Sequence, residues 1–170
     1  MKRIVAFALS LAIFSAAPLA LATDSKGAAY YGGTLMAFNG AKDPVEGKID
    51  TTNEKALTFY ATDKQFTGRS FSIPYDRVLD LEYGQKAGRR VGTAVATTVL
   101  FGPIGLVSLL SKKRKHFLTV GFKDDSNKDQ LAVIELGKDI VRTTIPIIET
   151  RSGKKVEFQD EESGKAGLQD

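Results

Sequence analysis

Short segments in which apolar and polar residues alternate fill much of the sequence between residues 30 and 136. A repeat of two is typical of β-strands with one buried face. Turn-forming residues such as Asn39-Gly40 and Thr52-Asn53-Glu54 separate the segments. The pattern predicts seven short strands, enough for a small barrel or sandwich, at residues 34–38, 45–51, 57–60, 71–75, 79–83, 117–122 and 131–136.

The last element changes to a helical repeat. Between residues 140 and 151, apolar residues recur three and four positions apart, which predicts an amphipathic helix. Gly153 is a suitable residue to end it, whereas Pro146 predicts a kink, because proline lacks the backbone N–H. With no internal repeat and no second core, the predicted fold class is mainly β with a C-terminal helix (α+β): a seven-strand barrel or sandwich capped by one helix.

Three stretches carry a resemblance to a known family. They are RSFSIPYDRVLDLEYG (Arg69–Gly84), KKRKHFLTVGFKDD (Lys112–Asp125) and VIELGKDIVRTTIPIIETRSGKK (Val133–Lys155). Together with the element order, they make residues 30–156 resemble the pleckstrin-homology-like superfold, which includes bacterial PH-like and GRAM-like domains. The resemblance implies a barrel closed by a capping helix, and a role as a binding module for lipids or proteins.

The N-terminus reads as a secretory signal peptide over residues 1–22. A basic start, Met1-Lys2-Arg3, precedes an apolar run, and Ala20-Leu21-Ala22 supplies a small-x-small cleavage pattern. The alternative is a retained anchor, but the run is shorter than the ~20 residues that a spanning helix needs. We therefore expect an exported protein, periplasmic or extracellular, and peripheral to a membrane if the apolar segment described below meets lipid.

Charge is distributed unevenly along the chain. Removing residues 1–22, with Lys2 and Arg3, lowers the formal net charge from +4 to +2. Residues 157–170 carry −4, which leaves +6 on residues 23–156. The expected organisation is a linker at 23–29, a folded domain at 30–156 with an apolar insert at 91–110, and an acidic disordered tail at 157–170.

The apolar insert is the most unusual segment. Residues 91–110 contain no charge over twenty positions, and Gly102-Pro103 with Gly105 divides them into two arms. We expect an apolar helical hairpin inserted before the sixth strand. Basic residues flank it on both sides: Lys86, Arg89, Arg90, Lys112, Lys113, Arg114 and Lys115.

Three destinations are open for this hairpin: a membrane surface, a protein surface, which is either its own barrel or another copy, and a true membrane span. Near anionic head groups each basic residue contributes about 1 kcal/mol. A nucleic-acid partner is not expected, because no aromatic residues are interleaved with the basic run. The predicted membrane or partner contacts are Val99, Leu100, Phe101, Pro103, Ile104, Leu106, Leu109 and Leu110.

The amino-acid composition limits the kinds of catalysis and metal binding that the chain can support. The chain has no cysteine, and His116 is its one histidine, which excludes thiol catalysis and His-rich metal sites. The Asp124-Asp125 loop lacks the glycine and terminal glutamate of a calcium loop, so a hairpin turn is expected there. No set of residues supplies a nucleophile, a base and an orienting group. We predict no catalytic, cofactor-binding or metal-binding residues.

These observations favour a non-enzymatic, exported binding or scaffold domain, whose insert and basic flanks mediate association with a membrane surface or a protein. The alternative is a homo-oligomeric structural protein that uses the hairpin as its assembly interface. A periplasmic hydrolase is the weaker alternative, since carboxylate pairs that form only in space leave no sequence signature.

Overall fold

The computed structural model describes residues 27–84 and 115–159. These residues form one eight-stranded sheet with the strand order β4-β3-β2-β1-β7-β6-β5-β8. The strands are β1 (Ala28–Gly33), β2 (Val45–Asp50), β3 (Ala56–Ala61), β4 (Ser70–Pro74), β5 (Val78–Gly84), β6 (His116–Lys123), β7 (Asp129–Leu136) and β8 (Val156–Phe158). All neighbours pair antiparallel except β5 and β8, which are parallel.

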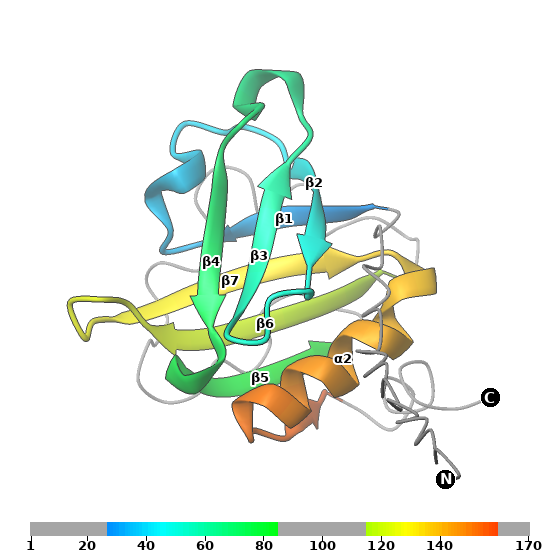
Figure 1. Cartoon of the computed structure of the whole chain (residues 1–170). Helices are drawn as coiled ribbons and strands as arrows, with labels where there is room; N and C mark the ends of the chain where they lie inside the picture. The colour runs from blue at the N-terminus through cyan, green and yellow to red at the C-terminus, as the bar shows by residue number, and fades with distance from the viewer. Residues whose placement is uncertain (1–26, 85–114, 160–170) are drawn as a thin grey trace, which may run out of the picture.

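One α-helix, α2 (Lys138–Ser152), and three short 3-10 turns complete the described part of the chain: η1 (Met36–Phe38), η2 (Lys64–Phe66) and η3 (Tyr75–Arg77). In Figure 1, β2, β3 and β4 lie in front of β1 and β7, and α2 lies on that same side, in front of β5. We call this side of the β1–β7–β6–β5 layer the inner face, and the opposite side the outer face. The main hydrophobic core fills the inner face, and α2 contributes Ile140, Val141, Ile145 and Ile148 to it.

The predicted seven-strand barrel or sandwich is wrong. The sheet is open, because β4 and β8 at its two ends each pair with one neighbour. The η3 corner turns the chain so that β4 and β5 do not pair, and β8 takes the edge of β5 instead. Within residues 27–84 and 115–159 there is no apolar helical hairpin, and the residues assigned to that hairpin, 91–110, lie outside the described ones.

Six of the seven predicted strands match observed ones, and the first does not. Gly32 and Gly33 adopt positive φ values of 140° and 137°, and β1 ends there. The alternating residues at 34–38 instead lead into η1, which buries Phe38 and leaves Met36 74% exposed. The helix prediction is confirmed: α2 runs continuously through Pro146 and ends at Gly153, which is left-handed.

Candidate partner-contact site

Most of the predicted contact site lies outside the described residues. This applies to Lys86, Arg89, Arg90, the run 112–114, and all eight predicted contacts: Val99, Leu100, Phe101, Pro103, Ile104, Leu106, Leu109 and Leu110. The structure does describe Lys115 and both points at which the chain enters and leaves this region. The predicted signal peptide at 1–22 and residues 160–170 of the predicted tail also lie outside the described ranges.

The two ends of the undescribed region are neighbours. Gly84, the last residue of β5, is the Cα partner of Phe117 in β6, and Lys115 directly precedes β6. Adjacent strands lie about 4.8 Å apart. Residues 85–114 therefore begin and end at the same end of one antiparallel ladder.

Lys115, the last predicted basic flank residue, is bound into the fold. Its Nζ donates to Glu135 Oε2 at 2.9 Å and to the hydroxyl of Tyr31, and it lies 4.9 Å from the centre of the Tyr31 ring. Burial disfavours the ammonium, but the bonds to Tyr31 and Glu135 outweigh it and raise the pKa of Lys115. For Tyr31 the direction of the burial effect is the opposite: burial disfavours the phenolate and raises its pKa. The Lys115 ammonium thus has a structural role at the point where the chain enters β6.

An apolar cluster beside Lys115 lies on the outer face. Its members are Tyr31 of β1, Phe117 of β6, and Leu131 and Val133 of β7, with Ala29 packed against them. The rings of Tyr31 and Phe117 meet edge to face, with centroids 4.9 Å apart. We call these four buried residues the outer apolar cluster. They come from three neighbouring strands, so they form one patch of side chains across the sheet.

Carboxylates lie next to this cluster, on the same face. Asp80 and Glu82 belong to β5, and Glu157 of β8 is the register partner of Glu82. Glu82 is buried and accepts a hydrogen bond from Gln159 Nε2 at 2.6 Å. Burial raises the pKa of Asp80, and Glu157 adds to the shift, although the backbone of Gly121 opposes it. The outer face is thus apolar over most of β1, β7 and β6, with the Lys115–Glu135 ion pair at one end, and acidic over β5 and β8.

His116 follows Lys115 and contacts the inner side of the sheet. Its Nδ1 lies 2.5 Å from the hydroxyl of Tyr83. Burial lowers the pKa of His116, and Lys138 lowers it further, while Glu135 opposes the shift. Burial raises the pKa of Tyr83 to about 12. The neutral pair is a structural contact that leaves neither group charged near neutral pH.

The described residues contain no group of three or more His, Asp and Glu side chains that could hold a metal ion. The Asp124 carboxylate accepts hydrogen bonds from the backbone N–H groups of Ser126 and Lys128 and from the Gln130 side chain, which together lower its pKa. The expected hairpin turn between β6 and β7 is therefore confirmed, with Asn127 at a positive φ of 59°.

No known protein-family model and no curated protein matches the chain. In the two described ranges, no helix has both the length and the apolar character required to cross a membrane.

Proposed function

We propose that this chain is a non-enzymatic, exported binding domain that attaches to an anionic membrane surface through residues 91–110 and the basic residues around them. The observation that carries the proposal is the pairing of Gly84 with Phe117. Because the chain leaves and returns at one end of the β5–β6 ladder, the insert makes an excursion on one side of the domain. A re-entrant dip into a membrane needs that geometry, whereas a single span would separate the two ends by about 30 Å.

The chemistry of the insert supports the same partner. Twenty uncharged residues supply apolar surface, and Gly102-Pro103 supplies a turn at its middle. Lys115 is neutralised by Glu135, so the cations left for lipid head groups are the other six: Lys86, Arg89, Arg90, Lys112, Lys113 and Arg114. Each would contribute about 1 kcal/mol near an anionic surface.

Vesicle flotation tests the proposal. The mature chain, residues 23–170, should float with vesicles that contain anionic lipid, and should float less with purely zwitterionic ones. A variant with residues 91–110 replaced by a Gly/Ser linker should stay at the bottom of the gradient. A chain that ignores anionic vesicles would overturn the proposal.

A charge-matched pair of variants separates specific from general attraction. Changing Lys112, Lys113 and Arg114 to Glu should abolish binding. Changing three exposed lysines on the scaffold, Lys42, Lys55 and Lys64, to Glu alters the net charge equally and should leave most binding intact. Equal losses in the two variants would show that net charge, rather than the flank, attracts the membrane.

Light scattering on the same samples tests the homo-oligomeric alternative. A monomer that floats supports the membrane proposal. A stable oligomer that ignores vesicles, and that becomes monomeric when residues 91–110 are replaced, would support assembly through the insert instead.

A further inference from the structure

The outer apolar cluster is buried more completely than its own members can explain. Val133 is 0% exposed, Leu131 1%, Tyr31 2% and Phe117 3%. Side chains that stand next to one another on one face of a sheet shield each other laterally, but not from above. A cover over the outer face is therefore required.

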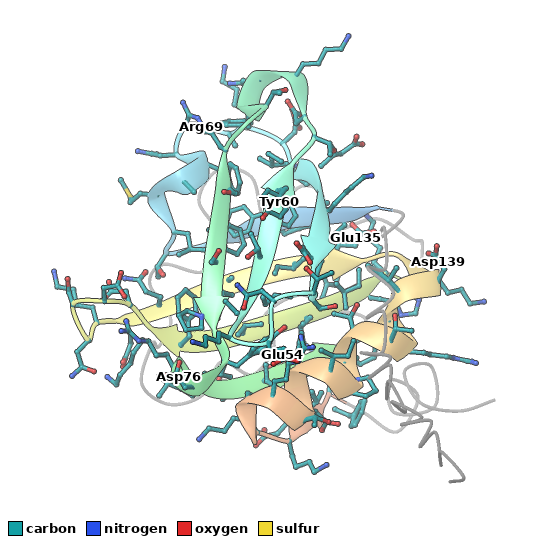
Figure 2. All side chains as sticks on the ribbon, viewed as in Figure 1. Glu54, Tyr60, Arg69, Asp76, Glu135 and Asp139 are labelled. Atoms are coloured by element: carbon teal, nitrogen blue, oxygen red, sulfur yellow. The ribbon has the colours of Figure 1, made fainter. Side chains whose placement is uncertain are left out.

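The other described elements pack on the inner face and do not cover this cluster. The buried residues of β2, β3, β4 and α2 all belong to the main core on the inner face, and none of them joins the outer apolar cluster. Figure 1 shows those elements on the near side of the β1–β7–β6 layer. Figure 2 has the same view and labels Tyr60 and Glu54 on that near side. Among the described residues, the cluster draws its members from β1, β6 and β7 alone.

We infer that residues 91–110 of the same chain are the occupant of this outer face. The first argument is position: residues 85–114 start after Gly84 and end before Lys115, beside Tyr31 and Phe117. The second is size. The cluster crosses three strands, about 10 Å, and the eleven residues 91–101 would reach about 16 Å even as a helix.

The third argument is complementarity. The insert is apolar in its centre and basic at its ends, and the outer face is apolar over β1, β7 and β6 and acidic over β5 and β8. Lys86, Arg89 and Arg90 follow directly after β5 in the sequence, the strand that carries Asp80 and Glu82. Apolar surface is thus matched with apolar surface, and basic residues with acidic ones.

The inference goes beyond the membrane proposal and does not depend on it. Residues 91–110 have no charged position, and most of their side chains are apolar. Docking one side of the segment on the sheet leaves the other side uncharged and available to lipid. The outer face would act as a seat that holds the insert in place before any membrane is met.

Cross-linking tests the inference without lipid. Because the chain has no cysteine, any cross-link must form between the two introduced residues. Ala29→Cys, beside Tyr31, is combined in turn with Leu100→Cys, Leu106→Cys or Leu109→Cys in the mature chain and treated with a short bis-maleimide. At least one pair should cross-link within one chain, as read by mass and by gel mobility. The matched control replaces Ala29→Cys with Tyr60→Cys, an exposed position on β3 that should give no such product.

Two outcomes would overturn the inference. One is a product with the mass of two chains, which would place a second copy on the outer face. The other is failure of all three pairs although the thiols react with a monofunctional maleimide. These results are separate from flotation, so the seat and the membrane contact can fail independently.

A second measurement avoids introduced cysteines. Val133→Thr keeps the side-chain shape but adds a hydroxyl to the outer face. Trypsin should then cut at residues 112–114 about tenfold faster than in the unaltered chain, which corresponds to a loss of 1.4 kcal/mol in docking. An unchanged cutting rate would contradict the proposed seat.

Discussion

The inner and outer faces of the β1–β7–β6–β5 layer differ in what covers them. On the inner face, Tyr30, Phe38, Phe59 and Phe71 form one group of aromatic rings, with neighbouring centroids 5.3 to 6.3 Å apart. The outer face has four large apolar residues, with an ion pair on one side and carboxylates on the other. The inner face holds the larger hydrophobic core, and the outer face holds a smaller apolar cluster with charged neighbours.

The burial patterns of the individual strands also differ. β2 and β4 alternate between buried and exposed residues, as expected for a strand covered on one side. In β6 and β7, runs of consecutive residues are buried, which is typical of strands covered on both sides. β6 and β7 are therefore buried on both faces, while β2 and β4 have one side open to solvent.

The largest predicted effect is on the inner face. Phe59→Ala removes a fully buried ring from the aromatic group and should lower the free energy of unfolding by about 3–5 kcal/mol. Chemical denaturation measures the loss. The neighbouring Tyr60→Ala removes a half-exposed ring and should cost much less. Similar losses at the two positions would contradict the placement of Phe59 in the core.

The second prediction concerns the outer face. Val133→Ala removes two buried carbon atoms and should cost about 2 kcal/mol by the same measurement. Leu79→Ala, at a partly exposed position in β5, is the control and should cost less. A loss at Val133 smaller than at Leu79 would mean that the outer face is open to water, and the contrast between the faces would disappear.

The third prediction tests the polar rim of the outer face. Lys115→Met removes the ammonium that bonds Glu135 and Tyr31 while keeping the length of the side chain. Because both partners of the ion pair are about one quarter exposed, the expected cost is about 1 kcal/mol. Lys64→Met, at an exposed position on η2, should be neutral. Equal changes in stability for the two variants would contradict the structural role of Lys115.

The smallest predicted effect depends on pH. Burial lowers the pKa of His116 in the folded chain below its ordinary value of 6.5. Below pH 6.5 the unfolded chain binds more protons at this position than the folded one, so stability falls as the pH falls through the folded pKa. His116→Gln should flatten the dependence between pH 5.5 and pH 7, measured by denaturation at each pH. An unchanged slope in this variant would assign the titration to other groups.

Local patterns in the sequence predicted most elements, but not their arrangement. Alternation located β2 to β7 because each has a buried inner side, and the helical repeat located α2. It missed β1, because the first strand was predicted at 34–38 and residues 23–29 as a linker, and it missed β8, which has three residues and carries Glu157 at its centre. Whether the sheet closes depends on pairing between distant strands, and no short pattern contains that information.

The candidate site, like the fold, could be predicted only in part from the sequence. The sequence identified the apolar insert, and its flanking strands predicted that both ends lie on one side. The outer apolar cluster was missed because alternation was read for one face only. A signal was present: Leu131 and Val133 are apolar, as are the intervening Ala132 and Ile134, so β7 has apolar residues on both faces. The group of carboxylates formed by Asp80, Glu82 and Glu157 could not be predicted, because it depends on the parallel pairing of β5 with β8.

The position of β1 in the middle of the sheet has a consequence for how the chain is made. β1 lies between β2, which follows it closely, and β7, where Ala28 pairs with Leu136, more than a hundred residues later. During synthesis, this first strand has one open edge until almost the whole chain has emerged. Such distant pairing makes folding slow. The pairing on this side of β1 can form only after β7 has been made, so the two halves of the sheet join late in synthesis.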